Sequence, residues 1–139
     1  MSNPDTKPRI LIVDDNALIA ELVETRLRIE GMLPTKCSGG REAIEVIGTQ
    51  PFDAVILDIM MPDVDGYQVL RHIRSTPATA SLPVIFLTAK STPDDIEKGL
   101  AMGANSYIAK PFSGLDLVRK IRLCLEERKA GGPEPRVAG

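Results

Sequence analysis

Residues 54–66 read AVILDIMMPDVDG, and this stretch holds the main clue to the fold. Its first four residues, Ala54 to Leu57, form a continuous apolar run, which is typical of a strand buried on both faces of a parallel sheet. The run ends at Asp58. Because an unpaired buried carboxylate costs free energy, we expect Asp58 to lie at the end of the strand and to face a polar site.

Apolar runs and helical patterns alternate along the chain on both sides of this stretch. Short apolar runs predict four further strands, at residues 10–13, 33–37, 84–87 and 107–109. Apolar residues at helical spacing predict five helices, over residues 17–30, around 43–47, after Gly66, from Thr92 to Gly103, and after Ser113. In the first helix the apolar positions are Leu18, Ile19, Leu22, Val23 and Leu27.

The alternation of strand and helix predicts an α/β fold. Continuous apolar strands that alternate with helices indicate a parallel sheet covered on both faces. Pro34 cannot donate a ladder hydrogen bond, so the second strand belongs at an edge of the sheet. We therefore expect a flavodoxin-like, doubly wound sheet of five parallel strands in the order 2-1-3-4-5, with five helices.

Composition indicates one ordinary globular domain. Hydrophobic residues make up 43% of the 139 residues, charged residues 26%, and the formal net charge is -2, which gives no argument for nucleic-acid binding. No apolar run approaches the roughly 20 residues that cross a bilayer. The N-terminal residues MSNPDTKPR lack the apolar stretch of a signal peptide. We therefore expect a cytoplasmic protein that contacts neither membrane nor nucleic acid.

Two features outside the strand and helix pattern complete the sequence. Cys37 and Cys124 are far apart and form no CxxC motif, so we expect ordinary free thiols. Residues 1–7 are polar and residues 129–139 are rich in Gly and Pro, so both are expected to be flexible tails, the second of them a linker if the protein is longer.

Polar side chains follow four of the predicted strands and meet at one rim of the sheet. They are Asp14, Asp15, Asp58, Thr88 and Lys110. Three neighbouring carboxylates repel one another, and a hard cation with oxygen ligands, Mg²⁺, relieves that repulsion. No His or Cys lies at these positions, which disfavours zinc. The lone His72 is expected to be an exposed or partly packed residue of the third helix.

This set of side chains suits phosphoryl transfer. An ionised carboxylate can attack phosphorus and form an aspartyl phosphate without a general base. Mg²⁺ and Lys110 can neutralise the phosphoryl oxygens, while Thr88 can donate a hydrogen bond to one of them. Each residue alone is a weak signal, and their joint placement at the strand ends makes the prediction specific.

Four motifs at matching spacings, ILIVDD, AVILDIMMPDVDG, LPVIFLTA and GANSYIAKPF, resemble the receiver domain of two-component response regulators over residues 8–128. Within this family the chain resembles single-domain regulators of the chemotaxis type. The resemblance implies the role of each site residue. Asp58 matches the phosphoacceptor, and Lys110 matches the lysine that pairs with the phosphoryl group. Asp15 matches a direct Mg²⁺ ligand, Asp14 a ligand that binds the ion through water, and the Met60 backbone carbonyl a further metal ligand. Thr88 and Tyr107 match the pair of residues that switches on phosphorylation. The resemblance also implies a cis Lys110–Pro111 bond.

The same resemblance implies the partners. The phosphoryl donor would be a sensor histidine kinase or a histidine phosphotransfer protein, and acetyl phosphate could replace it. The protein would not be a conventional enzyme, although it would assist its own phosphorylation and dephosphorylation. Its output surface would be the fourth helix, fifth strand and fifth helix, around Lys90, Met102, Tyr107 and Leu115. That surface would bind a downstream effector, a fused output domain or a second phosphorylated copy.

Two other functions fit the sequence less well. A Mg²⁺-dependent phosphohydrolase with an aspartyl nucleophile usually has an acid two residues after the nucleophile, where Met60 stands here. A nucleotide- or flavin-binding module needs a glycine-rich loop after the first strand, where the sequence reads DDNAL. The sequence leaves open the cognate kinase, the downstream target, the oligomeric state, the lifetime of the phosphorylated form, and whether the chain is part of a longer regulator.

Overall fold

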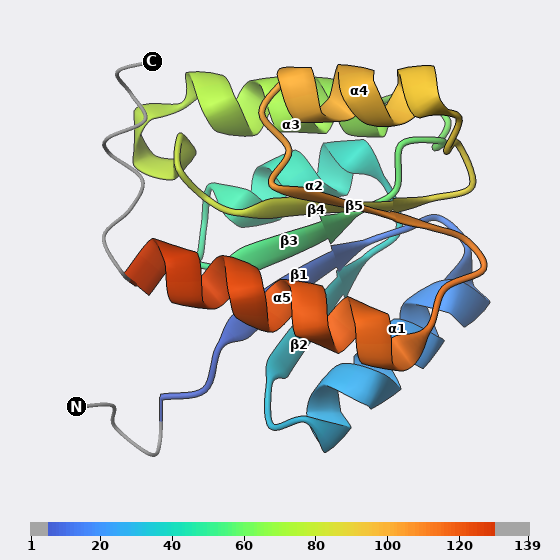
Figure 1. Ribbon diagram of the computed structural model, residues 1–139. Coiled ribbons are helices and arrows are strands. Elements are labelled where there is room, and N and C mark those ends of the chain that lie inside the picture. The colour runs from blue at the N-terminus through green and yellow to red at the C-terminus, as the bar shows by residue number, and fades with distance from the viewer. Residues whose placement is uncertain (1–5, 130–139) are drawn as a thin grey trace.

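The computed structural model describes residues 6–129. They form a parallel sheet of five strands in the order β2-β1-β3-β4-β5, with helices on both faces (Figure 1). The strands are β1 (Arg9–Val13), β2 (Leu33–Cys37), β3 (Ala54–Leu57), β4 (Val84–Thr88) and β5 (Ser106–Ala109). The helices are α1 (Ala17–Ile29), α2 (Gly40–Ile47), α3 (Gly66–Ser75), the short 3₁₀ helix η1 (Pro77–Thr79), α4 (Pro93–Ala101) and α5 (Gly114–Lys129). The predicted tails lie almost wholly outside the described residues.

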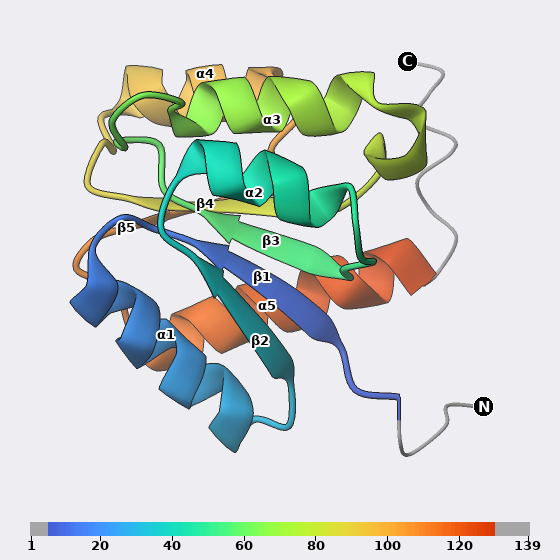
Figure 2. The ribbon, with the colours of Figure 1, turned by 180° about the vertical axis from the view of Figure 1, so that it is seen from behind.

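The predicted fold class and strand order are confirmed. β2, which contains Pro34, lies at one edge of the sheet and β5 at the other. Helices α1 and α5 cover one face, while α2, α3 and α4 cover the opposite face (Figure 2). The register places Val13 beside Leu57 and Leu57 beside Phe86, so the carboxyl ends of the central strands lie side by side.

The sheet separates two layers of core. Alternate residues of each strand face opposite ways, so Leu11 and Val13 pack with α2 and α3, while Ile10 and Ile12 pack with α1 and α5. All four residues of β3 are buried, as its apolar sequence predicts. The two cysteines are free and buried in different layers, and burial raises the pKa of Cys37 to about 12 and of Cys124 to about 11.

Helix ends follow local sequence signals. Thr92 caps α4, where the sequence predicts the helix to begin, with Pro93 at the first helical position. The Asp95 side chain accepts from the Thr92 N–H and closes a capping box. Asp65 and Gln68 form the same kind of box at the start of α3. These caps fix where the two helices begin beside the ends of β3 and β4.

The predicted helix over residues 17–30 is present as α1, but only part of its apolar set is buried. Leu18 and Leu22 follow helical spacing, but their exposed fractions are 65% and 52%. The buried face of the helix is formed by Ala20, Val23 and Leu27 instead. An apolar strip is therefore left on the outer side of α1, next to the carboxyl end of β1.

Among the described residues, no helix has both the length and the apolar composition needed to cross a bilayer.

Candidate functional site

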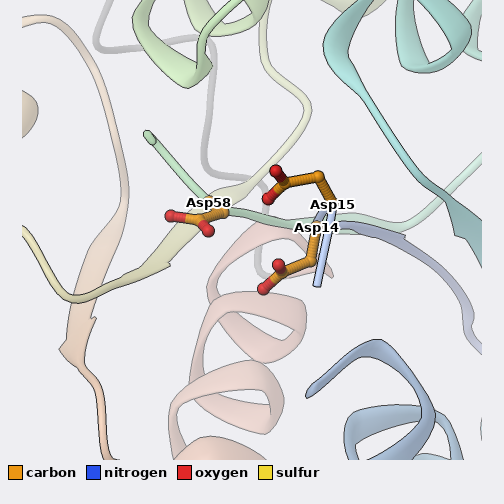
Figure 3. Close-up of side chains that lie close together, drawn as sticks. All are labelled: Asp14, Asp15 and Asp58. Carbon is orange, nitrogen blue, oxygen red and sulfur yellow. The ribbon is translucent and has the colours of Figure 1, made fainter. Parts of the chain in front are cut away.

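Three acidic side chains meet at the carboxyl ends of β1 and β3 (Figure 3). Carboxylate oxygens of Asp14, Asp15 and Asp58 all lie within 4.8 Å of one another. Asp14 and Asp58 are buried, with exposed fractions of 4% and 5%, whereas Asp15 is exposed. The sequence prediction that these acids converge at one rim of the sheet is thus what the fold produces.

Lys110, which follows β5, is the positive partner of the two buried acids. Its Nζ lies 2.9 Å from Asp14 Oδ2 and 3.1 Å from Asp58 Oδ2. Burial disfavours the ammonium, but its hydrogen bonds to both carboxylates outweigh this and raise the pKa of Lys110. At Asp14 burial disfavours the carboxylate and raises the pKa, although the hydrogen bond from Lys110 opposes that shift. The carboxylate that ends β3 is therefore paired inside the molecule.

Backbone amides fix the remaining oxygens of the buried acids. The Asn16 N–H donates to Asp14 Oδ1 at 2.9 Å, and the Met60 N–H donates to Asp58 Oδ1 at 3.1 Å. The peptide bond between Lys110 and Pro111 is cis, as the family resemblance implies. Asp14 and Asp58 are therefore held in one orientation, while the exposed Asp15 can turn toward an incoming group.

Gly66 holds the loop after Asp58 close to the strand end. A Cβ on this residue would lie 2.4 Å from the Asp58 backbone oxygen and 2.6 Å from Ile59 Cα. Its N–H donates to the Ile59 carbonyl at 2.9 Å, which closes the loop. Only glycine fits this approach, so Gly66 is a site-positioning residue that the sequence analysis did not single out.

Thr88 and Tyr107 are joined through the backbone of one residue, Lys90. Thr88, fully buried at the end of β4, accepts a hydrogen bond at Oγ1 from the Lys90 N–H at 3.2 Å. The Tyr107 hydroxyl donates to the Lys90 carbonyl. The half-buried Tyr107 ring packs edge-on against Phe86, with ring centroids 5.6 Å apart. Burial raises the pKa of Tyr107 to about 12.

The donor set fits Mg²⁺. The three carboxylates offer oxygen ligands only, and Mg²⁺ prefers oxygen and binds through one or two carboxylates with water in the other positions. Asp15 is exposed, so an ion can reach it while keeping bound water. Met60, the other expected ligand residue, follows Asp58 in the same loop with its side chain exposed.

The predicted His72 environment is confirmed, since His72 is half-buried in α3.

Known proteins match this chain over most of its length. The model of the response regulator receiver domain matches residues 10–122. A probable transcriptional regulator of Guillardia theta is 43% identical over 121 residues, which cover 87% of this chain and 46% of that protein. Regulatory protein VanRc of Enterococcus gallinarum is 40% identical over 114 residues, which cover 82% of this chain and 48% of that protein. The chain spans about half the length of these curated relatives.

Solved structures agree with the sequence matches. The receiver domain of the Francisella response regulator 1452 superposes with a TM-score of 0.83 at 30% identity, covering 88% of this chain and 99% of that one. The receiver domain of a sensor histidine kinase from Pseudomonas aeruginosa, with a magnesium ion coordinated in its active site cleft, gives a TM-score of 0.80 at 33% identity, covering 87% and 99%. With this fold, this acid cluster and these matches, the chain belongs to the response regulator receiver domain family of two-component signalling.

Proposed function

We propose that Asp58 is the residue that receives the phosphoryl group, within a receiver domain spanning residues 8–128. The observation that carries this assignment is the placement of Asp58 at the end of β3, paired with Lys110 and within reach of Asp14 and Asp15. A carboxylate oxygen of Asp58 attacks phosphorus and forms an acyl phosphate. The bond from phosphorus to the leaving group breaks, and that group departs with the electron pair, as imidazole from a phosphohistidine or as acetate from acetyl phosphate.

The surrounding side chains neutralise the charge that the transfer brings. Lys110 already donates a hydrogen bond to Asp58 Oδ2, and the same ammonium can donate to a phosphoryl oxygen once Asp58 is phosphorylated. Thr88 can release the Lys90 N–H and donate its own hydroxyl proton to another oxygen. Mg²⁺, when bound by Asp14, Asp15, Asp58 and the Met60 carbonyl, would supply positive charge at the phosphoryl oxygens and orient them. We include in this proposal that the site assists its own dephosphorylation.

The proposed labelling reaction can be tested on the chain alone. Incubation with acetyl phosphate and Mg²⁺ is expected to add one phosphoryl group, seen as a single step in intact mass. Excess chelator is expected to remove the gain, because the transfer needs positive charge beyond that of Lys110. A gain that persists undiminished in chelator would exclude the proposed role of the metal, and a gain of two or more groups would exclude a single acceptor.

Mg²⁺ binding should depend on Asp15 more than on Asp14. Asp14 already shares its oxygens with Lys110 and the Asn16 N–H, whereas Asp15 is exposed. A saturating metal stabilises the folded state by mass action, and we expect about 1–3 kcal/mol for the unmodified chain. Thermal melts with and without Mg²⁺ should show this gain largely lost in Asp15→Asn and partly kept in Asp14→Asn.

The control for the metal experiment is Asp63→Asn. Asp63 is an acid of the β3–α3 loop with a side-chain exposed fraction of 73%, paired at 3.4 Å with Arg41. The substitution Asp63→Asn removes the same charge as Asp15→Asn without changing the acid cluster. Mg²⁺ should therefore stabilise Asp63→Asn as much as it stabilises the unmodified chain. Equal gains in Asp15→Asn and Asp63→Asn would refute the ligand assignment.

A protein donor needs a docking surface beside the site, and α1 offers one. Its outer side carries the exposed side chains of Leu18, Leu22 and Ile29, which line a shallow cavity with Thr25 and Arg26. Large exposed apolar residues grouped beside a reactive site are typical of interaction surfaces. We include in the proposal that a histidine kinase or phosphotransfer protein contacts this face while its phosphohistidine reaches Asp58.

Output is proposed to pass through α4, β5 and α5. Lys90, in the loop before α4, and Met102, directly after α4, are half-buried, and Leu115 is exposed at the start of α5. An effector, a fused output domain or a second copy would bind this surface better in one state of the switch. The relatives are longer than this chain and are named as transcriptional regulators. The prediction that the protein does not contact nucleic acid therefore applies to residues 8–128 alone, and it remains a prediction. A cytoplasmic location fits this role and also remains a prediction.

A further inference from the structure

Gly99 is an unusual residue for its place in α4. It lies inside the helix, where glycine is less favourable than alanine because it loses more backbone entropy on folding. It is also the one buried residue of α4, all of which the structure describes. A glycine that weakens a helix and is buried indicates that something packs too closely for a side chain.

The rings of Tyr107 and Phe86 occupy that space. A Cβ on Gly99 would lie 2.9 Å from Tyr107 Cε2 and 3.1 Å and 3.2 Å from Phe86 Cδ2 and Cε2. Real Cβ atoms essentially never approach another heavy atom closer than 3.0 Å. The tightest contact is therefore with Tyr107, and a methyl group at position 99 requires that ring or the helix to move.

Of the two rings, only Tyr107 has room to move. Phe86 has an exposed fraction of 0% and lies between Tyr107 and Tyr67, whose ring contacts it edge-on at 5.9 Å. The Lys98 ammonium in turn lies 4.2 Å from the centre of the Tyr67 ring. Tyr107 is half-buried on the edge strand β5, so its ring can turn outward into solvent.

The inward position of Tyr107 is connected to the proposed acceptor site by two hydrogen bonds. The Tyr107 hydroxyl donates to the Lys90 carbonyl, and the Lys90 N–H donates to Thr88 Oγ1. When the ring turns outward, the first bond breaks and the Lys90 carbonyl loses this partner. The position of the ring and the orientation of Lys90 are thus linked.

We propose that Gly99 is a positioning residue for the switch, because its missing side chain is what allows Tyr107 to pack inward and reach Lys90. Any side chain at this position shifts the population of the Tyr107 ring outward. The output surface then loses its hydrogen-bonded connection to Thr88 through Lys90. The steric part of the inference stands by itself, while its consequence for signalling rests on the proposed function.

Fluorine NMR can test the steric part directly. The chain has two tyrosines, so 3-fluorotyrosine gives signals from only two sites, which Tyr67→Phe and Tyr107→Phe assign. In Gly99→Ala we expect the Tyr107 signal to move toward the value in the unfolded chain and to gain a larger solvent isotope shift, while the Tyr67 signal stays nearly in place. The matched control is Gly48→Ala, where the nearest atom to a Cβ is 3.6 Å away and both signals should stay unchanged.

A double-mutant cycle separates this effect from general damage to α4. If Tyr107 is the obstacle, Gly99→Ala should cost less stability in a Tyr107→Ala background than in the unmodified chain. A Gly99→Ala variant that fails to fold until Tyr107→Ala is added supports the proposal in the same way. An unchanged Tyr107 signal in folded Gly99→Ala, or an equal cost in both backgrounds, would overturn it. Neither measurement uses phosphorylation, so failure here is distinguishable from failure of the Asp58 assignment.

Discussion

Asp58→Asn is expected to abolish phosphorylation by acetyl phosphate while leaving the protein folded. Asparagine keeps the shape and size of the side chain, so the Met60 N–H can still donate to its carbonyl oxygen. The amide lacks the negative oxygen that attacks phosphorus. Intact mass spectra of Asp58→Asn should therefore show no phosphoryl gain under conditions that label the unmodified chain fully.

The matched control for this variant is Asp63→Asn. Asp63 lies in the same loop, five positions further along, and its carboxylate faces solvent. Asp63→Asn should be labelled at the rate of the unmodified chain, so the loss in Asp58→Asn cannot come from reduced loop charge. Labelling of Asp58→Asn at the unmodified rate would remove Asp58 from its proposed role.

Lys110→Ala is expected to give the largest loss of stability among changes at the site. The substitution leaves the buried carboxylates of Asp14 and Asp58 without the ammonium that lies 2.9 Å and 3.1 Å from them. Breaking a buried ion pair by removing one partner costs about 3–5 kcal/mol. The Lys110 side chain is 16% exposed, so we expect about 3 kcal/mol at neutral pH, measured by urea unfolding.

The pH dependence of that loss follows from the direction in which burial shifts the pKa of Asp14. Burial raises the pKa of Asp14 above its ordinary value, and removing Lys110 takes away the contact that opposes this rise. A carboxyl group whose pKa is raised in the folded state costs stability as the pH rises through that pKa. The deficit of Lys110→Ala should therefore shrink as the pH falls below neutral, because the Asp14 carboxyl then takes up a proton, and it should also shrink when Mg²⁺ is added.

A surface lysine provides the control for Lys110→Ala. Lys120 pairs with Asp116 on α5 at 3.8 Å, and its side chain is 35% exposed. Lys120→Ala should change stability by less than about 1 kcal/mol with little dependence on Mg²⁺. An equally small effect of Lys110→Ala would show that the buried acids do not depend on the lysine.

The fold and the acid cluster could be predicted because their signals are local. Each buried strand is a short apolar run, Pro34 marks an edge, and the residues after the strands meet wherever a parallel sheet forms. The switch role of Thr88 and Tyr107 and the metal-ligand role of Met60 came from the family resemblance alone. The contact of Lys110 with Asp14 was not expected, because only the folded rim shows that the ammonium reaches both acids.

What the sequence analysis missed depends on packing between distant segments. Leu18 and Leu22 lie at helical spacing like the buried Val23 and Leu27, but spacing alone does not tell which of these apolar residues are exposed. The need for glycine at Gly66 and Gly99 arises from backbone and rings contributed by other elements. Local propensity at Gly99 even opposes the observed helix, and the conflict is explained by the rings of Tyr107 and Phe86 that pack against it.

The most direct test of the central claim is to locate the phosphoryl group on the unmodified chain. Borohydride reduces an aspartyl phosphate to homoserine, which peptide mass spectrometry can assign to one position. After labelling with acetyl phosphate and Mg²⁺, we expect homoserine at position 58 and unchanged aspartate at positions 14 and 15, with no homoserine when chelator replaces Mg²⁺. Homoserine at position 14 or 15, or at position 58 in equal yield with chelator, would contradict the account.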